Sequence, residues 1–122
     1  MEHKGIATMA SFGELLREKR RRAAISQRDL ASRAGLDFSY ISKLENDRMQ
    51  PPAAHTVVTI CGVLGIEPEE LLAASGKLPA DVQASVGSSP AAQSFLQNAS
   101  KMRLTEEEWK ELQSSLHRLR ES

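Results

Sequence analysis

Residues 26–46 read SQRDLASRAGLDFSYISKLEN, and this stretch decides the fold. Ser26 is a residue type that caps helices, and Asp29 follows three residues later, where it can close a capping box. A helix is therefore predicted to begin at Gln27. Gly35 follows the apolar stripe of this helix and supplies the left-handed conformation in which helices commonly end. The stretch thus opens with one short helix and a tight turn.

A second short helix follows the turn. Asp37 is placed to cap it, and Ile41 and Leu44 recur at the spacing of a buried helical stripe. The small side chain of Ala31 in the first helix allows the two helices to cross closely. In a helix-turn-helix motif the second helix lies in the major groove of DNA, where its outer residues meet base edges. The residues predicted to face outward and read bases are Phe38, Ser39, Tyr40, Ser42 and Lys43.

The stretch resembles the Cro and C-type phage repressor family, also called the XRE family. The resemblance covers roughly residues 11–75 and rests on Gln27, Ala31, Gly35, Ile41, Leu44, Glu45 and Asn46. It implies a lambda-repressor-like DNA-binding domain. It also implies a structural ion pair between Arg20, which stands seven residues before the glutamine of the motif, and Glu45 near the end of the second helix.

Contacts with DNA are also implied by this resemblance. Phe38, Ser39 and Lys43 occupy positions at which family members touch base edges. Phe38 departs from the family, where a polar residue is common, so an apolar contact such as one to a thymine methyl is expected to replace a hydrogen bond. The motif glutamine and asparagine usually hold phosphates, and the loop after the motif often does so too. The predicted phosphate contacts are Gln27, Arg28, Asn46, Arg48 and Gln50.

Apolar patterns elsewhere in the chain are helical, and no segment is typical of a strand. Ser11 and Glu14 predict a capping box at the start of a helix before the motif. Residues 56–64 predict an apolar helix after it. The expected fold is all-α, with a five-helix lambda-repressor-like domain at residues 11–76 and a disordered arm at residues 1–10.

Formal net charge is zero, but the charges are unevenly distributed along the chain. Residues 1–50 contain ten Lys or Arg against seven Asp or Glu, residues 51–76 none against three, and residues 77–122 six against six. The basic excess therefore falls in the segment that contains the motif. Because phosphate binding depends on the local field, overall neutrality does not argue against DNA binding.

The C-terminal part has a different composition. Residues 77–88 are rich in Ser, Ala, Gly and Pro and predict a linker with one short helix, and residues 89–122 predict a C-terminal helical hairpin. Apolar residues of its last helix recur at steps of three, four and three, with few partners in the same segment. The hairpin is expected to pair with its copy in a homodimer or to pack on the DNA-binding domain. The predicted dimerisation residues are Phe95, Leu96, Trp109, Leu112, Leu116 and Leu119.

Other function classes find little support. The sequence has no glycine-rich phosphate loop, no metal-ligand cluster and no nucleophile beside a base, so we expect no catalytic residues, no metal and no cofactor. A single cysteine, Cys61, fits a reducing compartment. No apolar run approaches the ~20 residues of a membrane span. A cytoplasmic protein that is not an enzyme and does not bind membranes is expected.

Two functional hypotheses remain open. The first is a sequence-specific transcriptional regulator, more often a repressor in this family, that binds a pseudo-palindromic operator as a homodimer through the recognition helix at residues 38–46. The second is a protein-interaction module, such as an antitoxin-like or partner-titrated regulator, that acts mainly through residues 77–122. Occupation of the apolar stripe by a second copy or by another protein would distinguish them.

Overall fold

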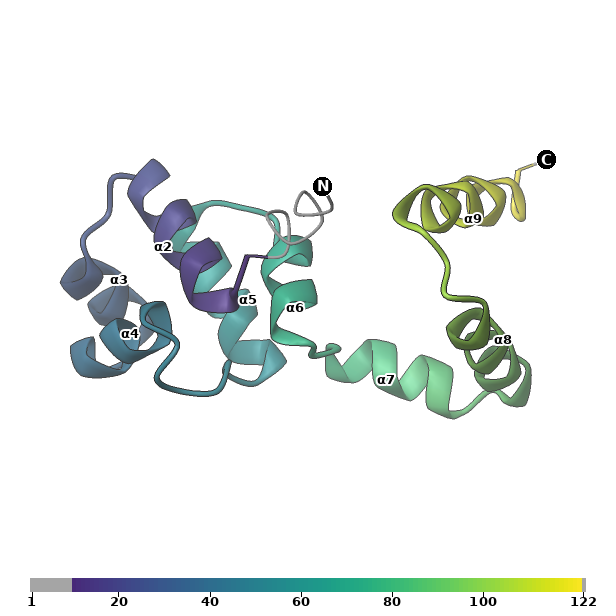
Figure 1. Cartoon of the computed structure of the whole chain (residues 1–122), viewed down its shortest axis with the longest axis horizontal. Helices are drawn as coiled ribbons and strands as arrows, with labels where there is room; N and C mark the ends of the chain where they lie inside the picture. Colours follow the sequence, from purple (N-terminus) through teal and green to yellow (C-terminus); the bar gives the residue numbers. More distant parts are fainter. Residues whose placement is uncertain (1–9, 122) are drawn as a thin grey trace, which may run out of the picture. The chain divides into compact units, whose positions relative to one another are not determined.

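The computed structural model describes residues 10–121, which form helices and no strand (Figure 1). The chain divides into two compact units, residues 1–80 and 81–122. The boundary falls inside the segment predicted as a linker, whereas the arm predicted at residues 1–10 lies almost entirely outside the described part. The helices are α2 (Phe12–Arg22), α3 (Gln27–Ala34), α4 (Phe38–Glu45), α5 (Ala54–Leu64), α6 (Glu69–Ser75), α7 (Ala80–Gly87), α8 (Pro90–Met102) and α9 (Glu106–Arg118).

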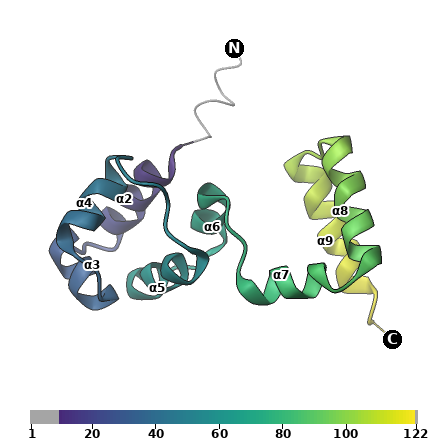
Figure 2. The ribbon, with the colours of Figure 1, turned by 90° about the horizontal axis from the view of Figure 1, so that it is seen from below.

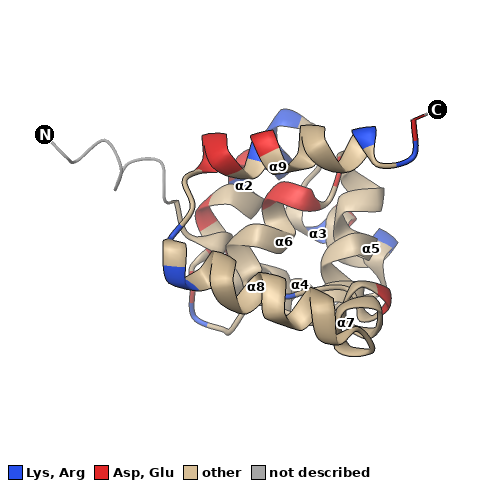
Figure 3. Cartoon of the chain, turned by 90° about the vertical axis from the view of Figure 1, so that its right-hand side faces the viewer, with Lys and Arg blue, Asp and Glu red and all other residues tan. Residues whose placement is uncertain are grey.

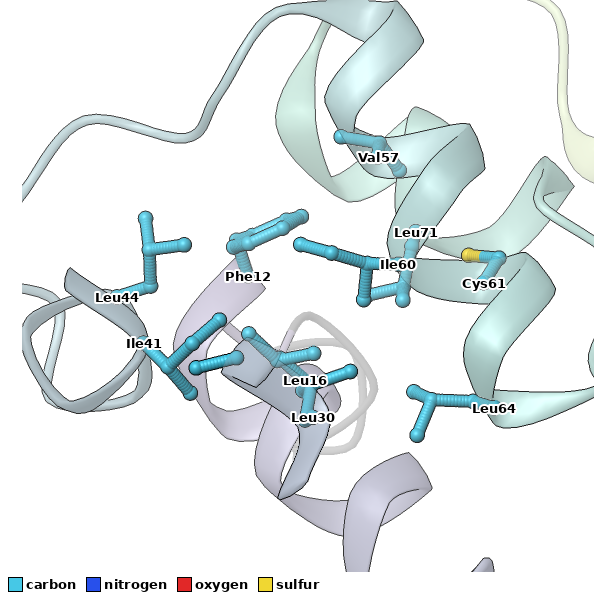
Figure 4. Packing of buried hydrophobic residues seen from close by; sticks show 11 residues of the cluster. Phe12, Leu16, Leu30, Ile41, Leu44, Val57, Ile60, Cys61, Leu64 and Leu71 are labelled. Atoms are coloured by element: carbon cyan, nitrogen blue, oxygen red, sulfur yellow. The ribbon is translucent and has the colours of Figure 1, made fainter. Parts of the chain in front are cut away.

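Helices α2 to α6 form the first unit and enclose one hydrophobic core (Figures 1 and 2). Each helix contributes at least one fully buried apolar side chain, and the side chains converge between the helices (Figure 4). The all-α expectation is confirmed, and so is the stripe predicted on α5, although α5 begins two residues earlier than Thr56. The core residues are Phe12, Leu16, Leu30, Ala31, Ile41, Leu44, Val57, Ile60, Cys61, Leu64 and Leu71.

The helix-turn-helix is formed by α3, the turn after it and α4. Gly35 ends α3 at φ 71°, in the left-handed region that favours glycine. Ser26 accepts a hydrogen bond from the Asp29 amide, as predicted, but the return bond of a capping box is absent. The Asp29 carboxylate instead pairs with Arg33 one turn on, at 3.0 Å. Asp37 stands at the N-cap of α4 without a side-chain cap bond, so its predicted capping is wrong in that detail.

Helix α2 and the end of α4 approach closely at Gly13. An added Cβ there would lie 2.6 Å from Asp47 Oδ1 and 2.8 Å from the Glu45 carbonyl oxygen, and it would also collide with the Leu44 carbonyl. Asp47 fastens this contact, because it accepts hydrogen bonds from the Gly13 amide at 3.0 Å and from Ser11 Oγ at 2.7 Å. The loop after α4 is thereby attached to the N-terminus of α2.

The substitution Gly13→Ala is expected to destabilise the first unit by about 1–3 kcal/mol, the usual cost of overpacking. Helix propensity alone would make the alanine variant more stable by about 1 kcal/mol. A loss of stability would therefore indicate overpacking at the contact between α2 and α4. Gly62→Ala is the matched control, because Gly62 lies within α5 and no atom lies within 4 Å of its added Cβ. Urea unfolding followed by circular dichroism should show Gly13→Ala less stable and Gly62→Ala as stable as the wild type or more so. Equal stability of the two variants would contradict the close approach.

The second unit contains α8, α9 and all of α7 except its first residue. A capping box formed by Thr105 and Glu108 begins α9. Among the described residues of this unit only Ala99 is a buried hydrophobic residue, whereas Leu116 and Leu119 are 62% and 74% exposed. Figure 3 shows few charges on α7 and α8, while α9 carries both signs. The unit therefore leaves much of its apolar surface open.

Candidate nucleic-acid interface

Helix α4 exposes a narrow face. Phe38, Ser39 and Lys43 are exposed and Ser42 is half-buried, and together they occupy positions i, i+1, i+5 and i+4 of one helical face. Phe38 is 39% exposed although it is aromatic and lies beside a well-packed core. These four residues are among the five predicted to read bases, and the structure places them on one surface.

Tyr40 does not belong to this face. Its side chain is half-buried and packs against the hydrophobic core. The helical period explains this position, since residue 40 lies one turn before buried Leu44 and next to buried Ile41. The structure therefore does not group Tyr40 with the four residues above, and its base-reading role stays a prediction.

Glu45 anchors the end of α4 to α2. Its side chain is almost fully buried and meets Arg20, with Oε2 2.5 Å from Nε and Oε1 2.9 Å from Nη2. This two-point pairing has the geometry in which arginine binds a carboxylate most strongly. The Gln27 amide donates a third hydrogen bond to Glu45 Oε1 at 2.9 Å. The ion pair implied by the resemblance is thus present, and Gln27 completes it from α3.

Arg17 is a member of this network that the sequence reasoning missed. Its Nη2 group donates to the Glu45 carbonyl at 3.1 Å and to Asn46 Oδ1 at 2.9 Å, and its Nε lies 3.6 Å from Glu45 Oε1. The amide of Asn46 also donates to the Ser42 carbonyl at 2.9 Å. Arg17 stands one turn before Arg20 on α2, and this spacing was the available signal. The phosphate roles of Gln27 and Asn46 stay predictions, now for side chains held in place by neighbours.

The network shifts the pKa of Glu45. Burial raises the pKa of this carboxyl, but hydrogen bonds from Arg20 and Gln27, together with the charges of Arg20 and Arg17, outweigh burial and hold it below its ordinary value. The hydrogen bond to Glu45 likewise raises the pKa of Arg20 above its ordinary value. Both groups are therefore charged across the neutral range.

A pH dependence of stability follows. The pKa of Glu45 is lower in the folded than in the unfolded state, so its contribution is fully present above the unfolded value of about 4.3 and is lost as pH falls through the folded pKa. We expect the difference in unfolding free energy between wild type and Glu45→Gln to be constant near neutrality and to shrink in acid. Urea unfolding of both proteins at a series of pH values measures it. A difference that stays constant into strong acid would contradict the shift.

The loop after α4 ends the helix with an αL residue other than glycine. Asp47 has φ 57°, and the amide of Arg48 closes the helix end by donating to the Lys43 carbonyl at 2.8 Å. Arg48 and Gln50 are exposed in this loop. Their predicted phosphate roles are not tested by this geometry, which leaves both side chains accessible.

A shallow depression lies between α2, α3 and the start of α4. It collects four arginines, and the guanidinium carbon of Arg28 lies 4.4 Å from the centroid of the Phe38 ring. The depression also contains the N-cap of α3, where backbone amides favour anions. The lining residues are Arg17, Arg20, Arg21, Ser26, Gln27, Arg28, Phe38 and Glu45. Within the described residues no group of His, Cys, Asp and Glu is arranged to hold a metal, and no helix is long and apolar enough to cross a membrane.

This chain is similar to known helix-turn-helix proteins. The chain is 36% identical over 72 residues to the uncharacterized HTH-type transcriptional regulator RghRB of Bacillus subtilis (strain 168), an overlap that spans 59% of this chain and about half, 52%, of that relative. A solved chain from a SinR protein/SinI protein complex is similar with a TM-score of 0.49 and 17% identity, over 87% of this chain and 94% of that one. A family model described as a helix-turn-helix domain matches residues 13–77, more than half of the chain. The chain therefore belongs to the helix-turn-helix domain family, of the Cro and C-type repressor type that its sequence resembles.

Proposed function

We propose that this protein is a transcriptional regulator that binds double-stranded DNA sequence-specifically through α4. The observation that carries the proposal is the exposed face of Phe38, Ser39, Ser42 and Lys43, held rigidly by the buried Arg20–Glu45 pair. A recognition helix needs this combination, because its outer side chains must be free while its axis is fixed. The relative named as a transcriptional regulator supports the same function.

The proposed DNA contacts are of two kinds, to base edges and to phosphates. Side chains on the face of α4 read base edges, while cations around it bind phosphates and set the register. Arg28, whose guanidinium lies over Phe38, and Arg48, which is exposed in the loop after α4, supply positive charge for the backbone. The basic excess of residues 1–50 adds to this local field.

Alanine substitutions at Lys43 and Arg48 test whether base reading and phosphate binding are assigned to the correct residues. Lys43→Ala is expected to change base preference at one position of the site, with a loss of about 1–3 kcal/mol for the preferred base. Arg48→Ala is expected to weaken binding to all duplexes alike and to lower the salt dependence of the association constant by about one unit of slope. Selection from a random duplex pool, followed by titration at two salt concentrations, measures both. Uniform weakening by both variants would contradict the assignment of the reading face.

We further propose that the regulator is a homodimer that represses at a pseudo-palindromic operator. Support comes from the α9 seam, which we define as Trp109, Leu112, Leu116 and Leu119 and which lines an open apolar groove with Phe95. Two recognition helices one duplex turn apart would then read a two-fold symmetric site. A cytoplasmic location belongs to this proposal.

The second candidate function uses the same seam differently. Trp109 is 40% exposed, and α8 contributes exposed Phe95 to the same groove. In this candidate function another protein, rather than a second copy, covers the groove. In that case the chain would act as an interaction module, such as an antitoxin-like or partner-titrated regulator. The mass of the purified protein separates the two candidates, because only the homodimer forms without a partner.

A further inference from the structure

The contact between Arg28 and Phe38 suggests how the first residue of the recognition helix is used. We propose that these two side chains act as one unit that reads the 5-methyl group of a pyrimidine in the major groove, with Arg28 as the positioning residue. The guanidinium lies over the ring face, 4.4 Å from its centroid. The inference deepens the proposed function and rests on it, since it assumes that α4 enters the groove.

The stack restrains a side chain that would otherwise be free. Phe38 is the first residue of α4 and is 39% exposed, so few core atoms fix its rotamer. A guanidinium over the ring selects one orientation, because the attraction depends on the face of the ring. Arg28 comes from α3, so the stack also links the two helices of the motif at their N-terminal ends.

Arg28 can do this while it binds DNA. Its planar guanidinium presents one face to Phe38, and its N–H groups point outward in the plane, where phosphate oxygens bind. Of the other three arginines in the depression, Arg17 and Arg20 hold Glu45. Arg28 thus joins the phosphate contact predicted for it to the orientation of the base-reading ring.

A phenyl ring at a base-reading position restricts the target. It has no donor or acceptor, so it gains nothing from the polar edges of guanine, adenine or unmodified cytosine. Thymine offers a 5-methyl group in the major groove, and phenylalanine makes apolar contacts with it. 5-Methylcytosine presents the same methyl group at the same place on the pyrimidine ring. The recognised chemistry is therefore the 5-methyl group rather than a particular base pair.

The test uses the full chain and a duplex that it selects from a randomised pool. Each thymine of the selected duplex is replaced in turn by uracil, which removes only the methyl group. At one position in each half-site uracil should weaken binding about fourfold, the value of burying one methyl-sized group. At that position a C·G pair with 5-methylcytosine should bind about fourfold more tightly than the same pair with cytosine.

Three variants separate positioning from charge. Phe38→Ala should abolish the uracil penalty. Arg28→Lys keeps the charge but loses the planar stack, so the uracil penalty should fall below about twofold. The penalty is a ratio measured within one variant, so a loss of phosphate contacts that weakens all duplexes alike does not change it. Arg33→Lys is the matched control on α3, since Arg33 is exposed, pairs with Asp29 and should leave the penalty unchanged.

The possible failures are distinguishable. A wild-type chain indifferent to uracil at every thymine, or a penalty unchanged by Arg28→Lys, overturns the inference and leaves DNA binding by α4 intact. A chain that enriches no sequence from the pool overturns the proposed function and this inference with it. Both side chains are exposed, so thermal unfolding of the variants should match the wild type and exclude misfolding as the cause.

Discussion

Glu45→Ala is expected to lower the free energy of unfolding of the first unit by about 3–5 kcal/mol, the usual loss when one partner of a buried ion pair is removed. The side chain of Arg20 is only 11% exposed and donates to Glu45 through two nitrogen atoms. Without the carboxylate, this guanidinium and the amide of Gln27 keep the cost of burial and lose their acceptor. A domain of this size has a total stability of about 5–15 kcal/mol, so the loss is a large part of it.

Urea unfolding by circular dichroism measures the effect, and Trp109 supplies an internal check. Trp109 is the only tryptophan and lies in the second unit, so its fluorescence transition should be unchanged. Glu18→Ala is the matched control, because Glu18 pairs with Arg22 on the exposed side of α2 and such pairs contribute about 0–1 kcal/mol. A Glu45→Ala protein as stable as Glu18→Ala would show that the pair contributes nothing to folding.

Much of the fold could be predicted because its signals are local. The capping box that begins at Ser11 and the left-handed glycine at position 35 each depend on residues within one helical turn. Each of these features appears at the predicted residue. The core stripes follow from the helical period in the same way, which is why their side chains are found together in one cluster.

The errors have local causes as well. Asp29 is one methylene shorter than the glutamate of a capping box, and Arg33 stands one turn ahead to bind it. Tyr40 was placed on the outer face because it lies outside the buried stripe of Ile41 and Leu44, whereas its half-buried side chain packs against the core. For Asp29, a competing ion pair within the same helix decided the outcome.

Contacts between distant segments were beyond the sequence patterns. Gly13 has no unusual backbone angle. A glycine is needed there because a larger side chain would collide with the carbonyl oxygens of residues 44 and 45, and this contact forms only when α2 packs against α4. Arg17 and Asp47 likewise act across about thirty residues of chain, through Asn46 and Gly13 respectively. The resemblance to the repressor family predicted the Arg20–Glu45 pair. The further partners of Glu45, which are Gln27 and Arg17, could be identified only from the packed helices. The base-reading face was predictable because it is what remains after the buried stripe is assigned.

Leu116→Arg is expected to have the largest effect on assembly. Leu116 is 62% exposed in the α9 seam and lines the apolar groove with Trp109 and Leu119. Burying a leucine contributes about 1.5–3 kcal/mol, and a two-fold interface contains the residue twice. The substitution should therefore weaken a homodimer by at least about a hundredfold, with the cost of burying two like charges in addition.

Light scattering across a dilution series measures the mass, and titration with a selected operator measures the functional consequence. The wild type should stay dimeric at concentrations where Leu116→Arg is monomeric, and the variant should lose operator affinity steeply because its two recognition helices are no longer joined. Ser114→Arg is the matched control, since it adds the same charge to α9 at an exposed position outside the groove. If the wild type were monomeric and both variants bound DNA equally, the homodimer would be wrong. Another protein would then be expected to cover the α9 seam, because an exposed apolar groove of this kind usually marks an interaction site.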